Sequence, residues 1–407
     1  MPHDRLEGAL ADALGALRDS GRSKGRETIV SGIIPAADGR GPRITLAGEG
    51  DTPFLRMNSN GYLGLATDDA VIAAEESAVR AYGSGPGAVR FISGTWQPHI
   101  DLERDLARFH ARDAAMIFSS AYAAVMGVLS SLITPETAVI SDALNHNSII
   151  NAFRLSRPKT RAVFGHLNLA ELETCLAKAA GECRRAVVVT DGIFSMRSDH
   201  APLGEIADVV KSHDASFAEN AVLVVDDSHG VGAFGATGRG TEEVTTCGEV
   251  DVLIATLGKA FGVNGGYVAA GPTVIDYLRE TSPFYIYSNP ITPGEAAAAS
   301  AAIAIVDSPR GRALLDHLRT LTKRFEDGLV AQGLEIIPGE HPVVPLMVQD
   351  TARTSALVAH LRAHRILATG LNFPVVPKGD EEIRFQISAA HTEADIDEAL
   401  AALADFR

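Results

Sequence analysis

The sequence predicts an α/β fold in which a large domain is built on a mostly parallel sheet. Between about residues 60 and 295, short β-rich runs alternate with longer segments of helical periodicity. The β-rich runs are continuously apolar, which is typical of strands that helices cover on both faces. Polar residues follow five of these runs directly, and ligands bind at the carboxyl ends of the strands in sheets of this kind.

The expected elements begin with an amphipathic stretch, Leu6–Leu17, after which the first fifty residues become rich in glycine and charge. Strands of the large domain are expected at 114–118, 138–140, 186–189, 221–225, 251–256 and 266–270. Segments with the helical period lie between them at 101–111, 169–180 and 203–218.

An alanine-rich helix at 294–307 leads into the C-terminal part of the chain. There the pattern predicts helices at 310–332, 352–365 and 392–405, and short strands in VVPLMVQ (343–349) and EIRFQISA (382–389). We therefore expect an N-terminal segment at 1–59, a large domain at 60–295 and a smaller α+β domain at 296–407, with the N-terminal end joining the small domain.

The composition excludes several classes of protein. The 407 residues carry 36 Lys and Arg against 51 Asp and Glu, and this net charge of −15 argues against binding nucleic acid or an anionic membrane. Three cysteines without a CxxC spacing predict neither a disulfide framework nor a metal site. The start lacks a secretory signal, and the longest apolar run, 296–306, is too short to span a bilayer. A cytoplasmic protein is expected.

The polar residues behind the strands are those that a pyridoxal 5'-phosphate (PLP) site needs. Lys259 comes just past a buried strand, where partial desolvation suits a Schiff-base amine. Asp226 ends the neighbouring run and can pair with a protonated pyridine nitrogen, which keeps PLP an effective electron sink. An imidazole such as that of His229 can lie on the ring, and hydroxyls and N–H groups at the strand-to-helix turns can hold the phosphate.

Eight stretches in order resemble the α-oxoamine synthases, which are fold-type I PLP-dependent transferases that join an amino acid to an acyl-CoA. The likeness runs from about Asn58 to Phe406 and is closest to the glycine C-acetyltransferase (2-amino-3-ketobutyrate CoA ligase) branch. The stretches are SNGYLGLA (59–66), VRFISGT (89–95) followed by His99, ISDALNHNSII (140–150), DGIFSM (191–196), VVDDSHGVGAFGATGRG (224–240), TLGKAFG (256–262), PFYIYSN (283–289) and PVVPKGDEEIRFQISAAHT (374–392).

The resemblance implies four catalytic residues that also bind the cofactor. Lys259 is implied to be the Schiff-base lysine and the acid/base, and Asp226 the partner of the pyridinium nitrogen. His146 is implied to stack on the ring, and His229 to lie near its phenolic oxygen.

The resemblance also implies how the phosphate and the amino acid are held. Ser120, Ala121, Tyr122 and Thr256 are implied to bind the cofactor phosphate, and Ser288 and Asn289 to reach it from the other subunit of a homodimer with a shared active site. Asn60, Ser195 and Arg384 are implied to surround the amino acid, with Arg384 as the carboxylate partner, and Ser195 is implied to bind the cofactor as well. From the residues alone, the alternatives are a turn residue for Asn60, a helix cap for Ser195 and a surface strand position for Arg384.

We therefore expect a PLP-dependent acyltransferase that condenses glycine with an acyl-CoA thioester and releases CoA, with or without CO₂. One alternative is synthesis of the 8-amino-7-oxononanoate type, or a secondary-metabolite condensation fed by an acyl carrier protein. Others are transamination on the same fold and a non-catalytic partner subunit, although the latter should lack Lys259.

Three departures from the family pattern bear on the acyl donor. Gly61 stands where relatives often carry Asp or Asn, Arg197-Ser198-Asp199 replaces an Asp-Gly-type turn, and Trp96 and Pro98 interrupt a polar link. Because these places are expected near the acyl entrance, a donor other than acetyl-CoA is compatible with them. A basic run of Arg154, Arg157, Lys159 and Arg161 is either a solvated face or a contact for CoA phosphates or an acidic carrier protein.

Overall fold

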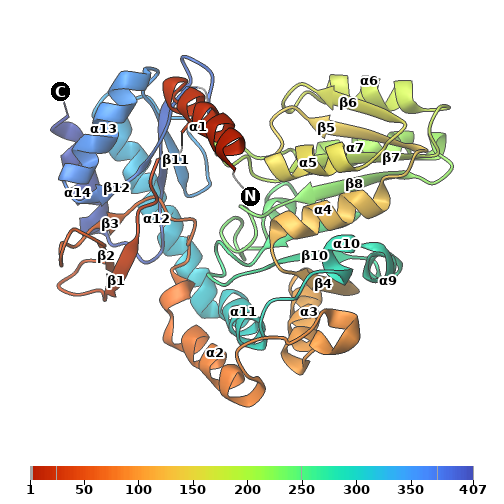
Figure 1. The fold of residues 1–407 in the computed structure, drawn as a ribbon, viewed down its shortest axis with the longest axis horizontal. Coiled ribbons are helices and arrows are strands. Elements are labelled where there is room, and N and C mark those ends of the chain that lie inside the picture. The colour runs from red at the N-terminus through yellow and green to blue at the C-terminus, as the bar shows by residue number, and fades with distance from the viewer. Residues whose placement is uncertain (1–2, 24, 249, 374, 407) are drawn as a thin grey trace. The chain divides into compact units, whose positions relative to one another are not determined.

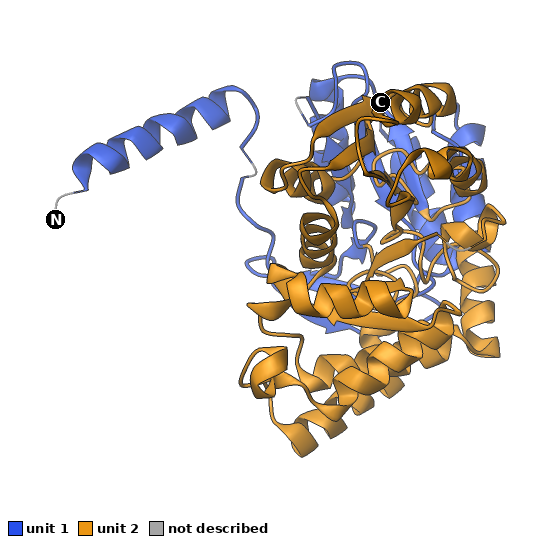
Figure 2. Cartoon of the chain, turned by 90° about the vertical axis from the view of Figure 1, so that its right-hand side faces the viewer, with its two compact units in different colours: residues 1–59, 320–339, 343–407 blue, residues 60–319, 340–342 orange. Residues whose placement is uncertain are grey.

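The computed structural model describes residues 3–23, 25–248, 250–373 and 375–406. Pro374, which begins the last of the eight stretches, lies outside the described residues, as do the first two residues of the predicted N-terminal segment. The chain divides into two compact units (Figure 2). Unit 1 comprises 1–59, 320–339 and 343–407, and unit 2 comprises 60–319 and 340–342. This division does not test the domain boundaries expected from the sequence, which stay a prediction.

A seven-stranded sheet forms the centre of unit 2 (Figure 1). Its strands, in the order in which they pair, are β4 (Ala114–Phe118), β10 (Gly266–Ala270), β9 (Val252–Thr256), β8 (Ala221–Asp226), β7 (Arg185–Asp191), β5 (Thr137–Asp142) and β6 (Thr160–Phe164). All neighbours from β9 to β6 are parallel, whereas β10 runs antiparallel to both β9 and β4. The prediction of a mostly parallel sheet is therefore confirmed.

Two features of this sheet were not predicted. Strand β6 was missed because its burial alternates, with Arg161 and Val163 exposed, as befits an edge strand rather than a covered one. The direction of β10 was not foreseen either. Only residues 257–265 join β9 to β10, and a parallel crossover needs a dozen or more residues.

Helices cover the sheet on both faces. A continuous apolar cluster joins one face to α4 (Ala121–Leu132), α5 (Asn147–Leu155), α9 (Pro272–Thr281) and α10 (Pro283–Ile286). Helices α6 (Leu169–Ala179) and α7 (Leu203–His213) pack on each other and on β6 and β8. Strands buried in this way carry apolar residues without alternation, which explains the continuous runs in the sequence.

The remaining helices of unit 2 surround this sandwich. They are η1 (Leu65–Thr67), α2 (Asp69–Tyr82), the π-helical turn η2 (Arg90–Gly94), α3 (Gln97–Phe109), η3 (Asp214–Ser216), α8 (Thr241–Val244) and α11 (Pro293–Val306), while α12 (Pro309–Ala331) begins in unit 2 and ends in unit 1. The predicted alanine-rich helix is α11, which packs on α2 and α3. It begins with a capping box in which Thr292 and Glu295 bind each other's backbone N–H groups.

Unit 1 combines helices with short strands. Helix α1 (Asp4–Asp19) contains the predicted amphipathic stretch, and α13 (Thr351–Ala363) and α14 (Glu393–Ala404) match two predicted helices. The strands are the antiparallel pair β1 (Val30–Ile34) and β2 (Arg43–Leu46), the parallel pair β3 (Leu55–Arg56) and β12 (Ile366–Leu367), and a sheet of β11 (Val343–Met347), β14 (Glu382–Gln386) and β13 (Thr369–Leu371). Strands β11 and β14 lie in the predicted VVPLMVQ and EIRFQISA, whereas β1, β2, β3, β12 and β13 were not predicted. In the part of the chain that the structure describes, no helix is both long and apolar enough to cross a membrane.

Candidate active site

A polar pocket lies in unit 2 where several strands end. Its lining combines Ala121, Tyr122, His146, Ser148, Asp191, Ile193, Ser195, Asp226, Ser228, His229, Thr256 and Lys259. These residues stand at or just beyond the carboxyl ends of β4, β5, β7, β8 and β9. Eight of them were candidates from the sequence, namely Ala121, Tyr122, His146, Ser195, Asp226, His229, Thr256 and Lys259. The structure thus brings these eight together, and their individual roles stay predictions.

Lys259 lies on the short connection between β9 and β10. The backbone N–H of Leu257 donates to the carbonyl of Gly265 at 2.9 Å, and the N–H of Gly262 donates to the carbonyl of Lys259 at 3.0 Å. The Thr256 hydroxyl donates to the Gly265 carbonyl at 3.1 Å and accepts from the N–H of Gly258 at 3.0 Å. The lysine therefore projects from a turn whose backbone is closed on itself.

Two carboxyl groups, those of Asp226 and Asp191, lie side by side at the ends of β8 and β7, where the two residues are register partners. Burial raises the pKa of Asp191 well above its usual range, and the negative charge of Asp226 acts in the same direction. The N–H of His146 donates to Oδ2 of Asp191 at 2.9 Å. Asp191 thus favours its protonated form beside the carboxylate expected to meet a pyridinium nitrogen.

His146 caps α5 and is held in a defined orientation. Its Nδ1 accepts a hydrogen bond from the backbone N–H of Ser148 at 3.2 Å and lies 2.8 Å from the Ser148 hydroxyl. Burial lowers the pKa of His146, and the positive charge of Lys259 adds to that effect while Asp226 opposes it. The ring is therefore a neutral imidazole, whose flat face suits stacking on an aromatic cofactor.

His229 is connected to residues outside the pocket lining. Its Nδ1 lies 2.8 Å from the hydroxyl of Tyr62, which donates to Oδ1 of Asn60 at 3.2 Å. Nε2 of the fully buried His341 lies 2.9 Å from the carbonyl oxygen of His229. Tyr62 and His341 were not identified as site residues from the sequence. Tyr62 stands in an apolar loop segment, and His341 is more than a hundred residues away from His229, the residue it contacts.

The start of α4 lies at the pocket and suits an anion. Ser120 caps the helix by accepting from the N–H of Ala123 at 3.1 Å, and Ala121 and Tyr122 line the pocket. The N–H groups of a first helical turn attract a phosphate. A Cβ at Gly266 would lie 2.2 Å from the backbone nitrogen of Ala121, so only glycine lets β10 begin this close to the helix.

The residues of this pocket fit PLP. They comprise an amine, a carboxylate, a neutral imidazole and a helix N-terminus, which match the aldehyde, the pyridine nitrogen, the ring face and the phosphate of that cofactor. The Ser228 hydroxyl also lines the pocket, is buried, and has no hydrogen-bond partner among the described residues. A bound polar group would satisfy it, since buried hydroxyls are rarely left unpaired.

Other predicted residues lie outside the lining. Ser288 and Asn289 follow α10 in unit 2, and the Ser288 hydroxyl donates to the Asn289 carbonyl at 3.3 Å. Arg384 lies in unit 1 on β14, half-buried and opposite Pro345 of β11 and Thr369 of β13. His99 is buried, with Nε2 2.8 Å from the carbonyl of Ile291, as expected for a packed residue rather than a catalyst.

Comparison with known proteins agrees with this chemistry. Residues 52–403 match the family model of aminotransferase class I and II. An 8-amino-7-oxononanoate synthase of Marinobacter nauticus is 42% identical over 89% of this chain and 89% of its own length. The mitochondrial 2-amino-3-ketobutyrate coenzyme A ligase of Bos taurus is 36% identical over 98% of this chain and 92% of its own.

Solved structures show the same fold. The serine palmitoyltransferase of Sphingomonas wittichii superposes with a TM-score of 0.87 at 25% identity, covering 99% of this chain and 97% of that chain. A high-resolution structure of SPT with PLP gives a TM-score of 0.85 at 26% identity, covering 99% of this chain and 98% of that one.

Proposed function

Because the chain belongs to the aminotransferase class I and II family, and its relatives include two kinds of α-oxoamine synthase, we propose that it joins glycine to an acyl-CoA thioester with release of CoA. The fold is that of a fold-type I PLP-dependent transferase, and the cofactor is PLP. The enzyme is an α-oxoamine synthase, that is, a PLP-dependent acyltransferase. Glycine and the acyl donor are the parts that we propose.

The observation that carries this proposal is the meeting of Lys259, Asp226, His146 and His229 in one pocket. PLP, when bound, withdraws electrons from Cα of the amino acid and so stabilises a carbanion that can attack a thioester. We assign to the Lys259 amine the removal of the Cα proton, and to Asp226 the holding of a proton on the pyridine nitrogen. Arg384 is proposed to hold the α-carboxylate, which would orient the Cα–H bond.

The two kinds of relative support two substrate pairs. The match to the 2-amino-3-ketobutyrate coenzyme A ligase extends through nearly the whole chain, including the first fifty residues, and this favours glycine. The higher identity to 8-amino-7-oxononanoate synthase favours a longer acyl group instead, and we keep that reaction as the second candidate. Loss of CO₂ stays open for the glycine reaction, and a carrier-protein donor belongs to the second candidate.

A thiol-release assay over a panel of amino acids and acyl-CoA esters tests the proposal. Glycine should release CoA from at least one ester, and the length of the best acyl chain separates the two candidates. The same acyl group on CoA and on a carrier protein tests whether the basic run from Arg154 to Arg161 serves a protein donor. Loss of the cofactor aldehyde without thiol release would indicate transamination, and a chain that does not retain PLP would indicate a non-catalytic subunit.

We further propose that the enzyme is a homodimer whose partner subunit completes the site through Ser288 and Asn289. Exposed apolar side chains on two contacting elements support a protein interface there. Phe91 and Ile92 of η2 are each 65% exposed, and Tyr287, just after α10, is 79% exposed. Apolar side chains that stayed exposed to solvent at this surface would lower the solubility of the protein.

Subunit mixing tests the shared site. Lys259→Ala and a double variant, Ser288→Ala with Asn289→Ala, should each be inactive alone. A mixed dimer would contain one intact site, so random exchange should restore about a quarter of the wild-type activity. Verified exchange without recovery would contradict a shared site, and mixing Lys259→Ala with itself provides the control.

A further inference from the structure

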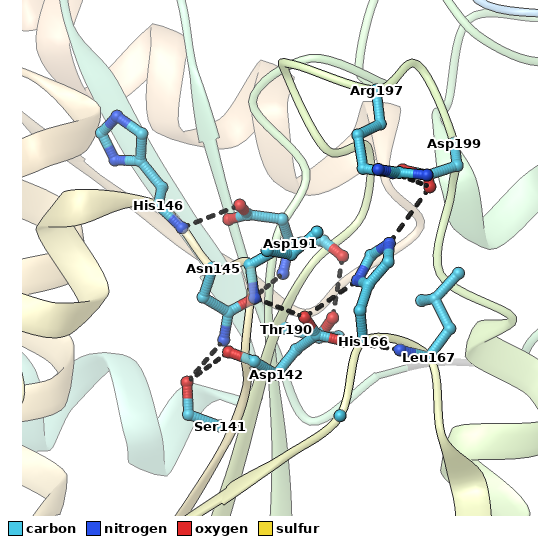
Figure 3. A network of polar contacts seen from close by, with 12 residues as sticks. Ser141, Asp142, Asn145, His146, His166, Leu167, Thr190, Asp191, Arg197 and Asp199 are labelled. Carbon is cyan, nitrogen blue, oxygen red and sulfur yellow. Dashed lines mark hydrogen bonds and ion pairs between the residues drawn. The ribbon is translucent and has the colours of Figure 1, made fainter. Parts of the chain in front are cut away.

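His166 lies between two carboxyl groups just beyond β6, outside the pocket lining (Figure 3). Its Nδ1 is 3.0 Å from Oδ1 of Asp142, which ends β5. Its Nε2 is 3.1 Å from Oδ2 of Asp199. Asp199 is the last residue of the segment 192–199, which follows β7 and is called the 192–199 loop below. The imidazole therefore connects a buried strand end to a loop.

The geometry favours a positive charge on this imidazole. A neutral ring carries a single N–H, so one of its nitrogens would face a carboxylate oxygen with a lone pair, whereas an imidazolium donates from both nitrogens. Asp142 is 2% exposed and also accepts from the backbone N–H groups of Leu144 at 2.8 Å and Leu167 at 2.9 Å. Although burial opposes the positive charge, hydrogen bonds to Asp142 and Asp199 raise the pKa of His166 to about 9.

The 192–199 loop carries part of the pocket. Ile193 and Ser195 line the pocket, and the ring of Phe194, the residue between them, packs nearly perpendicular to that of His166, with centroids 4.4 Å apart. The N–H of Phe194 donates to the carbonyl of Asp199, and the N–H of Ser198 donates to the carbonyl of Phe194, both at 3.0 Å. A contact with His166 at the end of the loop is therefore transmitted to Phe194 and to its neighbour Ser195.

The loop adopts a conformation that needs external support. Ser198 has φ of +63°, in the left-handed region that costs a residue with a side chain energy. The Ser198 hydroxyl and Oδ1 of Asp199 are buried without a hydrogen-bond partner among the described residues. Such a backbone persists where surrounding contacts determine it, and the His166–Asp199 ion pair is such a contact.

We propose that His166 is a positioning residue, which as an imidazolium binds Asp142 and Asp199 together and so holds Ser195 in place at the amino-acid site. The placement of Ser195 beside the substrate rests on the proposed function. The charged groups that face His166 are Asp142 from β5 and Asp199 from the loop, and Arg197 in turn binds Asp199, with Nε 3.3 Å from Oδ2. The contact therefore acts through Ser195, and His166 itself touches no reacting atom.

The charge state can be measured on the PLP-loaded wild-type enzyme without any turnover. Nitrogen NMR of labelled histidines, with the His166 signals assigned by their loss in His166→Gln, should show both ring nitrogens protonated at neutral pH. The signals should titrate with a pKa near 9. A neutral His166 at neutral pH would overturn the proposal whether or not the substrates are those proposed.

Two variants then test the connection to the pocket. His166→Gln and Asp199→Asn should each accelerate amide exchange in residues 193–199, and should raise the amino-acid KM about tenfold while the acyl-CoA KM stays within about twofold. The double variant should be no worse than His166→Gln alone, because that variant already lacks the contact with Asp199. His213→Gln, a substitution on α7 that breaks contacts of Nδ1 with the Val209 carbonyl and the Ser212 hydroxyl, is the matched control.

The wild-type amino-acid KM should also rise as pH passes about 9, and this rise should be absent from His166→Gln. Unchanged exchange in the 193–199 segment, or an equal rise in both KM values, would overturn the proposal. Asp199→Asn leaves the buried Asp142–His166 pair intact, so the test survives if His166→Gln does not fold. A wild-type enzyme that fails to release thiol would refute the proposed function while leaving the NMR and exchange results to decide the role of His166.

Discussion

The hydroxyl of Tyr62 lies 2.8 Å from Nδ1 of His229 and donates its proton to Asn60, whose Oδ1 is 3.2 Å away. A hydroxyl has one proton to give, so when that proton goes to Asn60 the oxygen accepts the Nδ1–H of His229, and Nε2 then carries the lone pair of the ring. Tyr62, which is fully buried, thereby favours one tautomer of a pocket histidine.

Tyr62→Phe should lower kcat about fivefold to tenfold, because the variant keeps the packing and loses one net hydrogen bond of about 1 kcal/mol together with the tautomer preference. Steady-state kinetics and PLP titration would measure the effect. Tyr277→Phe, which removes a hydroxyl 3.4 Å from the Ser131 carbonyl, is the control and should leave kcat unchanged. Equal rates in both variants would contradict a role for Tyr62.

Arg384→Ala should separate amino-acid recognition from cofactor binding. If the arginine holds the α-carboxylate, its loss removes a charge-assisted contact of about 1.5–3 kcal/mol and raises the amino-acid KM about tenfold to a hundredfold. PLP content and acyl-CoA affinity should change little. Arg384→Lys should rescue poorly, since a point charge does not reproduce the planar fork of arginine. A variant that instead lost PLP, or weakened acyl-CoA alone, would move Arg384 to another role.

Asp227 makes the stability of the protein depend on pH. Its carboxyl group is fully buried and accepts from the N–H and the hydroxyl of Thr241, each at 2.7 Å, yet burial raises its pKa to about 7. The folded state therefore binds a proton between about pH 4 and pH 7 that the unfolded state has released, so this residue's contribution to stability falls as pH rises through that window.

Asp227→Asn should remove this dependence, since an amide can still accept from the Thr241 N–H and donate to its hydroxyl. Urea unfolding at about pH 4.5 and pH 8 would measure the free energy of unfolding for both proteins. The wild type should lose more stability than the variant over that interval, by at most about 4 kcal/mol. Parallel pH profiles would show that Asp227 is ionised when buried.

Ser198→Gly should stabilise the protein by up to about 1 kcal/mol, because glycine adopts positive φ without strain. Ser198→Ala is the informative partner. It keeps the backbone strain and removes only the buried hydroxyl, which has no partner among the described residues. Thermal unfolding of the three proteins would therefore separate the two effects. A destabilised glycine variant would mean that the hydroxyl has a partner in the loaded enzyme.

The sequence allowed the sheet to be predicted wherever burial was complete. Runs such as AVLVV before Asp226 carry apolar residues at every position because helices cover both faces, and this pattern survives in a single sequence. Strand β6 has one exposed edge, so Arg161 interrupts its apolar run and the pattern is lost. In unit 1, β1 has no buried position, and its sequence VSGII shows no alternation of apolar and polar residues that would mark a half-buried strand.

The candidate site was predictable where each residue stands at or just beyond the end of its own strand, as Asp226 and Lys259 do. The residues that contact or position other pocket side chains were not, because they depend on contacts between segments far apart in the chain. His166 meets Asp142 and Asp199 across 24 and 33 residues, and Tyr62 meets His229 across 167. Single histidines and tyrosines carry no periodicity, and their partners become evident only in three dimensions.

The antiparallel direction of β10 has a consequence for engineering the enzyme. Thr256 and Gly266 are register partners, so the turn that carries Lys259 is the tip of a hairpin anchored on both sides by the sheet. An inserted residue between 257 and 265 cannot be absorbed by a neighbouring helix and would displace the lysine itself. In a random insertion library, functional clones should therefore carry no insertion within this hairpin, while insertions at exposed loops elsewhere in unit 2 are tolerated.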